Sequence, residues 1–536
     1  MGRSTRALAV AAIVTIPALI TVGAQFGGNA NWPTAGGDAQ RSSWMRNETK
    51  LSASGFSAST FQLLWKAKLE NTPVQLNALT QPLLLQNLIS HKGFKALAFV
   101  GGSGDVVYAI DYDLNRVYWK QTLSTAVRSG SSTADCPGGL TAITRAARLN
   151  TQAPPGRGGP GGGGRGAPPP PAPARGGAVG PAPAAPPNRG GINANNLPIN
   201  NATFAISSGG MLHFLNPHIG EDIQKPVRFF PARAKVSGLI QIDNVLYAAT
   251  ADGCGGAPNG VWAMDLASET RPIARWESAG SVVGTLGPAF AVDGTVFVAT
   301  GGPSAANAAN VKPAAGAPAN SVVSLEPGSL KLRRYFTAPA PFTTSPIVFR
   351  LKDRDLVAAS NSDGRLYVLD GQALGGPDHA TIVARSSEYA ALPMGTPQAL
   401  ATWEEPKGGR WILAPATTGI VAFKLVERGN ATLIEQGWTS RRMASPSPPT
   451  VFNDVVFVVD GGLPPDESKT PIAERVKRAG AAVLYALDAR TGKELWNSGT
   501  TITSFAYGVA PSAADSQVYV GTHDGTLYAF GLPMER

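Results

Sequence analysis

The sequence predicts an all-β protein, an eight-bladed β-propeller built from four-stranded blades. Three observations predict this fold: a strand motif that recurs eight times, a spacing that suits one blade per motif, and a composition rich in turn residues. The chain has 536 residues, of which 62 are Gly and 44 are Pro, and only 15% are charged. This composition favours many short strands joined by turns over a helical bundle.

The clearest copy of the motif lies near the C-terminus. Residues 483–488, Val-Leu-Tyr-Ala-Leu-Asp, are followed by a Thr-Gly turn and by a second strand that begins with Trp496. An Asp at the end of a strand accepts hydrogen bonds from turn amides, and Gly supplies a positive φ. The Trp then buries a large apolar surface against the neighbouring sheet.

The same pattern recurs along the chain, at different degrees of similarity. Neighbouring copies are 43 to 64 residues apart, except for the first interval of 105 residues. This spacing predicts one four-stranded blade per copy. The second residues of the eight copies are Tyr108, His213, Trp262, Val323, Tyr367, Val421, Tyr485 and Tyr528.

The long first interval contains an insertion at residues 151–201 that is rich in Pro, Gly, Ala and Arg. Such a composition cannot bury a core, so we expect a disordered loop within the second blade. Without these residues the first interval falls into the range of the others.

The two ends of the chain are predicted to share one blade. The last copy ends so close to Arg536 that no outermost strand can follow it. Residues 61–69, which include Trp65 at the position equivalent to Trp496, are predicted to supply that strand. The last blade would then be closed by an N-terminal strand, which ties the ring shut.

Residues 1–24 are predicted to be a signal peptide. Arg3 and Arg6 form a basic start, an apolar run covers residues 7–22, and Val-Gly-Ala precedes Gln25 as a small-residue cleavage site. A single membrane anchor is the alternative, because the run is nearly long enough to span a bilayer. No later segment reaches that length, so we expect a periplasmic or secreted protein without a membrane span after cleavage.

The formal net charge of +10 does not indicate a nucleic-acid partner. No acidic residue occurs between Asp135 and Glu221, so much of the excess positive charge lies in one insertion. The rest of the chain is nearly balanced, which argues for an ordinary solvated surface.

The two cysteines, Cys136 and Cys254, are predicted to form a disulfide, with two free thiols as the alternative. An oxidising compartment permits the bond. Cys136 falls in the crossing from the first blade to the second, and Cys254 in a loop of the third blade. No Cys/His group has the spacing of a haem or zinc site.

Two enlarged loops are expected on the same face of the propeller as the cysteines. They cover residues 301–320 and 461–480, and the second includes a short helix predicted over residues 471–478. Binding residues often sit on loops carried by a rigid scaffold. The alternative is that both loops are tolerated surface insertions.

The run 484–496 resembles the repeat of pyrroloquinoline-quinone (PQQ) enzymes. Residues 31–38, Asn-Trp-Pro-Thr-Ala-Gly-Gly-Asp, and residues 41–44, Arg-Ser-Ser-Trp, look like the opening of quinoprotein dehydrogenases. The resemblance implies a PQQ-binding-like propeller, a superfamily that includes PQQ- and calcium-dependent dehydrogenases and non-enzymatic relatives such as the BamB-type assembly factor. It also implies that the repeat tryptophans dock blades rather than stack on a cofactor: Trp65, Trp119, Trp276, Trp438 and Trp496.

The resemblance does not assign an activity. The adjacent Cys pair of PQQ alcohol dehydrogenases is missing, and the family's calcium ligands and catalytic Asp cannot be matched residue by residue. Catalytic, cofactor-binding and metal-binding residues therefore stay unassigned. We expect an exported binding or scaffold protein that holds an envelope protein or a small ligand on a propeller face. The alternative is a PQQ- and calcium-dependent dehydrogenase that oxidises an alcohol or a sugar.

Overall fold

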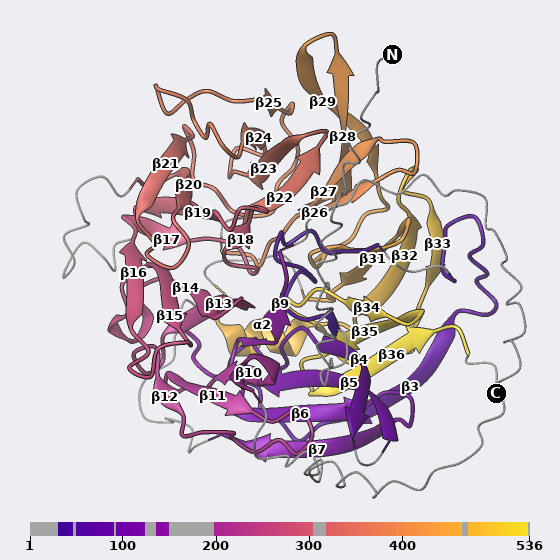
Figure 1. The fold of residues 1–536 in the computed structure, drawn as a ribbon. Helices are drawn as coiled ribbons and strands as arrows, with labels where there is room; N and C mark the ends of the chain where they lie inside the picture. The colour runs from indigo at the N-terminus through magenta and orange to yellow at the C-terminus, as the bar shows by residue number, and fades with distance from the viewer. Residues whose placement is uncertain are drawn as a thin grey trace, which may run out of the picture.

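The computed structural model describes residues 30–46, 50–90, 93–123, 136–149, 198–303, 318–393, 395–463 and 470–533. These residues form eight sheets arranged as the blades of a propeller (Figure 1). The predicted signal peptide and residues 151–197 of the predicted insertion lie outside the described residues. The chain resumes with the short 3-10 helix η2 (Ile199–Asn201). Within the described ranges, no helix has the length and apolar character needed to span a membrane.

Each of the first four blades runs from an inner strand to an outer strand. Blade 1 has β4 (Leu83–Ser90), β5 (Gly93–Gly102), β6 (Val106–Asp111) and β7 (Arg116–Thr122). Blade 2 has β8 (Ile143–Thr144), β10 (Thr203–Ile206), β11 (Met211–Leu215) and β12 (Val227–Arg228). Blade 3 has β13 (Lys235–Ile242), β14 (Val245–Ala251), β15 (Gly260–Asp265) and β16 (Ile273–Glu277). Blade 4 has β18 (Ala289–Phe290), β19 (Val296–Pro303), β20 (Ser321–Leu325) and β21 (Leu332–Thr337).

The other four blades follow the same plan. Blade 5 has β22 (Ile347–Leu351), β23 (Arg354–Ser360), β24 (Leu366–Asp370) and β25 (Ala384–Arg385). Blade 6 has β26 (Ala401–Glu404), β27 (Arg410–Ala416), β28 (Gly419–Arg428) and β29 (Ala431–Thr439). Blade 7 has β30 (Thr450–Phe452), β31 (Val455–Asp460), β32 (Val483–Asp488) and β33 (Glu494–Asn497). Blade 8 has β34 (Ser512–Ala514), β35 (Gln517–Gly521), β36 (Thr526–Gly531) and β3 (Gln62–Lys68).

Short additional strands extend four blades beyond the predicted four-stranded pattern. The strands β9 (Ala146–Ala147) and β2 (Trp44–Met45) pair in parallel with the inner strands β13 and β30. The strand β1 (Ala30–Trp32) pairs with β4, and β17 (Gly280–Val282) pairs with β19. The inner ends of several blades are therefore already covered by other parts of the chain.

All eight copies of the sequence motif are third strands of their blades, which confirms the predicted repeat. They are β6, β11, β15, β20, β24, β28, β32 and β36. A third strand is hydrogen-bonded on both edges and packed on both faces, so it reads as a nearly continuous apolar run. Every residue of β6 and of β36 is buried.

The ring is closed between the two ends of the chain. The strand β3 pairs antiparallel with β36, with Trp65 opposite Ala529 and Gln62 opposite Gly531. Figure 1 shows the purple β3 beside the yellow β36. The N-terminal strand thus completes blade 8, as the sequence predicted, and blade 8 meets blade 1 without a gap in the ring.

The repeat tryptophans lie on outer strands and pack against the next blade. Trp119 of β7 donates from Nε1 to the carbonyl of Pro217 at 2.9 Å, and Trp438 of β29 donates to the carbonyl of Ala489 at 3.0 Å. The Trp438 ring lies directly on Gly492, where an added Cβ would come within 2.4 Å of the ring. The turn therefore needs Gly both for this approach and for its φ of 70°.

The three remaining tryptophans take equivalent positions. Trp65 packs in the same cluster as Leu84 and Tyr108 of blade 1, and Trp276 packs in the same cluster as Phe290 of the next blade. Trp496 is only partly buried, and its ring lies 4.9 Å from that of Phe61. All five indoles therefore contribute apolar contact between blades.

Candidate functional site

The N-terminal segment lines the inner end of the ring. Residues 32–46, here called the axial segment, accept backbone hydrogen bonds from the inner ends of four consecutive blades. The carbonyls of this one segment therefore pair with the inner strands of blades that are far apart in sequence. The bonds run from Phe290 to Ala39, from Val348 to Gln40, from Thr402 to Ser42 and from Val451 to Ser43, each from amide to carbonyl.

Arg41 holds the axial segment to blades 3 and 4. Its side chain is fully buried, and it donates to the carbonyls of Pro288 at 2.9 Å and Gly238 at 2.7 Å. It also donates to Thr34 Oγ1 at 2.7 Å and to the carbonyl of Ala35 at 2.6 Å. Burial lowers the pKa of Arg41 to about 9, so the guanidinium is still charged at neutral pH. A cation surrounded by carbonyl oxygens therefore lies inside the ring.

Two glutamine side chains near the axial segment are also engaged by the protein itself. Gln81 accepts a hydrogen bond from the amide of Gly36 at 3.1 Å and donates to the carbonyl of Pro511 at 2.9 Å. Gln398 donates to the carbonyls of Leu392 at 3.2 Å and Pro393 at 3.0 Å. These amides brace the inner loops, so their hydrogen-bonding capacity is largely used.

Among the described residues, the axial segment contributes a buried cation and not a cluster of carboxylates. Calcium takes six to eight oxygen ligands, and carboxylates are prominent among them. In the part of the chain that the structure describes, no group of three or more His, Cys, Asp or Glu residues is placed to hold a metal ion. In addition, the buried charge of Arg41 would repel a second cation at the axis.

One face of the ring carries the two cysteines and the short helix that the sequence singled out, while residues 304–317 of the enlarged loop predicted at 301–320 lie outside the described residues. We call it the crossing-loop face, because it is formed by the loops between second and third strands and by the segments that cross between blades. There a disulfide joins Cys136 to Cys254, with 5.4 Å between the Cα atoms. Cys136 follows blade 1, and Cys254 begins the 3-10 helix η3 (Cys254–Gly256) of blade 3. The bond therefore spans the crossing into blade 2.

The helix α2 (Ile472–Arg478) lies on the crossing-loop face within the enlarged loop of blade 7, where the sequence predicted a short helix. Ile472 and Val476 pack against Leu76 and Phe505, which belong to the neighbouring crossing segments. Lys477 and Arg478 are exposed, whereas Arg475 is buried. The helix thus has an anchored apolar side and a basic side that is available for contact.

An aromatic stack stiffens the same region. The rings of Phe505 and His523 are stacked with centroids 4.2 Å apart, and His523 Nε2 lies 3.0 Å from the carbonyl oxygen of Gln75. These contacts tie a loop of blade 8 to the crossing segments on either side of it. The crossing-loop face is therefore held by covalent, apolar and polar contacts.

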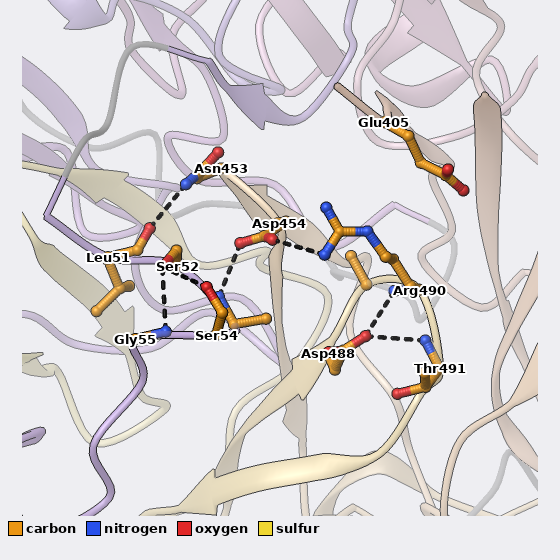
Figure 2. A network of polar contacts seen from close by, with 12 residues as sticks. Leu51, Ser52, Ser54, Gly55, Glu405, Asn453, Asp454, Asp488, Arg490 and Thr491 are labelled. Atoms are coloured by element: carbon orange, nitrogen blue, oxygen red, sulfur yellow. Dashed lines mark hydrogen bonds and ion pairs between the residues drawn. The ribbon is translucent and has the colours of Figure 1, made fainter. Parts of the chain in front are cut away.

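The opposite face carries a polar tie around Asp454 (Figure 2). Residues 50–61, here called the strap, lead into β3. Asp454 accepts from the amide of Ala53 at 2.8 Å and from Arg490 Nη1 at 3.1 Å, and Asn453 donates to the carbonyl of Leu51 at 3.1 Å. Figure 2 shows that Asp454 lies between the strap and the turn that carries Arg490. This cluster has a structural role, since its polar atoms bind one another.

Sequence reasoning missed the axial segment and Arg41. The residues from Asn31 to Trp44 were used only for their resemblance to a family, and an isolated Arg in a Gly-rich stretch is typical of solvent-exposed chain. The partners of Arg41 are backbone carbonyls, which leave no trace in a sequence.

The C-terminal blades match a known family. Residues 479–532, which cover β32 to β36, match the PQQ-type repeat described as outer membrane protein assembly factor BamB. No curated protein matches the sequence.

Solved structures of quinoprotein enzymes share the fold. The quinohemoprotein alcohol dehydrogenase from Comamonas testosteroni has 13% identity and a TM-score of 0.54 over 96% of this chain and 82% of that chain. The enzyme ADHIIG from Pseudomonas putida HK5 has 11% identity and a TM-score of 0.56 over 94% and 82%. A europium-containing methanol dehydrogenase has 12% identity and a TM-score of 0.56 over 96% and 100%. At these identities the likeness extends to the fold alone.

Proposed function

We propose that this PQQ-repeat β-propeller is a binding or scaffold protein of the cell envelope, which holds a partner on its crossing-loop face. One observation carries the proposal: the axial segment of the protein itself occupies the inner ends of the blades. Arg41 and the axial segment fill hydrogen-bonding positions at the inner ends of the blades. The crossing-loop face carries the disulfide and the enlarged loop with α2, so we assign the partner to this face.

The construction of this face supports a binding role. The bond between Cys136 and Cys254 and the apolar anchoring of α2 fix loops that would otherwise be mobile. A surface that is rigid before binding loses less conformational entropy on association. The disulfide also fits an oxidising compartment, as does the predicted signal peptide.

The charge on α2 indicates the kind of partner. Lys477 and Arg478 are exposed, while Glu474 lies 4.0 Å from Arg478 and offsets part of this charge. A basic helix at the rim of a contact surface favours an envelope protein with an acidic patch, mainly through faster association. Such an interaction would weaken as the salt concentration rises.

Site-specific photo-crosslinking in the source cell tests the proposal. A crosslinking residue at Lys477 on the crossing-loop face should give a discrete adduct with an envelope protein. The matched position is Lys407, which is also exposed but lies in the turn between β26 and β27 on the opposite face. Equal labelling at both positions, or none at either, would contradict a binding role for the crossing-loop face.

A titration with PQQ tests the dehydrogenase alternative. We expect no binding to the purified protein at high micromolar PQQ, with or without Ca²⁺, by tryptophan fluorescence and calorimetry. Tight one-to-one binding that requires Ca²⁺ would overturn the proposal. It would call for a substrate screen with alcohols and sugars and an artificial electron acceptor.

A further inference from the structure

A cavity of about 350 Å³ lies at the perimeter between blades 2 and 3. One wall comes from β12 and the loop before it, and the other from the turn between β15 and β16. Cavities of this volume are large enough for a small organic ligand. The cavity is remote from the crossing-loop features described above, and the function proposed for that face does not use it.

The walls of the cavity carry an excess of positive charge. Lys225, Arg228 and Arg271 line it together with a single carboxylate, that of Glu269. Among the described residues, none of the three cations forms an ion pair with a carboxylate. Arg228 is held in place by donating from Nη1 to the carbonyl oxygens of Gly209 at 3.1 Å and Phe230 at 3.3 Å. The cavity therefore contains cations whose charge the protein does not neutralise.

Arg271 presents a fixed donor to this cavity. Its guanidinium lies over the ring of Phe214, with Cζ 4.7 Å from the ring centroid, and its Nη2 donates to Gln224 Oε1 at 2.6 Å. Its backbone amide donates to the carbonyl of Ser268 at 3.1 Å, which fixes the turn around a left-handed φ of 47°. The orientation of the guanidinium is thus set before any ligand arrives.

Two hydrogen-bond donors of the cavity wall have no acceptor in the protein. Nη1 of Arg271 and Nε2 of Gln224 are both shielded from solvent and both unpaired. Leaving a buried donor without a partner is unfavourable. Burial also lowers the pKa of Arg271, which reflects the cost of desolvating its charge. An oxyanion placed beside Arg271 would offset the cost of desolvating its charge.

We propose that this cavity binds a small organic anion through a carboxylate or phosphate group. The guanidinium of Arg271, fixed by Gln224 and Phe214, attracts the oxyanion, and Lys225 and Arg228 balance the remaining charge. Val227 and Met264 provide an apolar wall for a short hydrocarbon portion. The site is independent of the function proposed for the crossing-loop face.

Calorimetric titration of the full-length protein with two probes tests this site. Succinate supplies carboxylates, inorganic phosphate supplies a phosphate, and each is titrated at low ionic strength. We expect saturable binding of at least one probe, and binding that weakens as NaCl is added. Binding of only one probe identifies the preferred head group. No saturable binding of either probe at millimolar concentration would overturn the proposal.

Two variants and a control locate the binding. Arg271→Met should raise the Kd at least tenfold, because it removes the guanidinium. Gln224→Leu should raise it several-fold, because it removes the Oε1 acceptor that fixes the guanidinium. Arg275→Met is the matched control, since Arg275 lies in the adjacent β16, is largely exposed and pairs with Glu277. If Arg271→Met does not fold, the Gln224→Leu variant still decides. Unchanged affinity in both variants would contradict the assignment, whatever the crosslinking experiment on α2 gives.

Discussion

Asp454 accepts a hydrogen bond from the backbone amide of Ala53 across a separation of 401 residues. The same carboxylate pairs with Arg490 at 3.1 Å. Asp454 sits in the turn between β30 and β31, and Arg490 in the turn between β32 and β33. One side chain therefore links the strap to both hairpins of blade 7, next to the blade that the N-terminal strand completes.

Asp454→Ala should destabilise the closed ring. The change removes both acceptors of a nearly buried carboxylate and leaves the amide of Ala53 and the guanidinium of Arg490 without their partner. We expect a loss of about 1–3 kcal/mol in the free energy of unfolding, measured by urea denaturation. The control is Asp353→Ala, because Asp353 is fully exposed and lies 3.8 Å from Arg350. Equal stability of the two variants would show that the tie has no energetic role.

Arg41→Met should have a larger effect. The variant keeps much of the side-chain volume but leaves the carbonyls of Pro288, Gly238 and Ala35 without a donor. We expect a loss of about 3 kcal/mol or more in the free energy of unfolding. Arg385→Met, at an exposed position in β25, should be nearly neutral. The two midpoints of chemical denaturation provide the comparison, and similar midpoints would contradict the role given to Arg41.

Reduction of the disulfide should lower thermal stability. Cys136 and Cys254 are 118 residues apart, and a bond that closes so long a loop restricts the unfolded chain strongly. Loss of the bond should cost about 2–5 kcal/mol, seen as a fall in Tm when a reductant is added. The double variant Cys136→Ser/Cys254→Ser should show the lowered Tm and no response to reductant. Peptide mapping under non-reducing conditions that found both thiols free would end this interpretation.

Asp524 should make the closure of blade 8 sensitive to acid. Burial alone would raise its pKa, but hydrogen bonds from Lys68, Thr522 and Thr526 together lower it to about 2. The unfolded value is near 3.9, so the folded state favours the carboxylate. This stabilisation is fully present above about pH 4 and is lost as the pH falls through about 2.

Comparison with Asp524→Asn checks this dependence. The difference in unfolding free energy between the wild type and the variant should be largest above about pH 4 and should shrink toward about pH 2. Urea denaturation at a series of pH values measures it. A difference that stays constant over this range would mean that the pair between Lys68 and Asp524 does not contribute through its charge.

The fold was largely predictable because its signals are local and repeated. A third strand buried on both faces is a continuous apolar run, so each motif copy marks one blade. The closure by β3 could also be inferred, because Trp65 repeats the position of Trp496. The helix α2 was visible from its own composition.

The contacts that define the axis and the cavity were not predictable, because they depend on pairs of positions without a shared motif. The partners of Arg41 are carbonyls of blades 3 and 4, and backbone atoms are the same for every residue type. Arg271 and Gln224 are 47 residues apart and meet only because blades 2 and 3 are adjacent. The short outer strands β12 and β25 have two residues each, which is too few for a periodic pattern.

The pairing of β3 with β36 also sets an order for biosynthesis. The strand formed by residues 62–68 leaves the ribosome early, yet its partner at residues 526–531 is made almost last. The carbonyls of the axial segment likewise cannot form their hydrogen bonds until Val348, Thr402 and Val451 have been synthesised. Pairing across such long stretches of chain is slow, so the N-terminal residues cannot reach their final state during synthesis. The ring can therefore close only after the last strand has been synthesised.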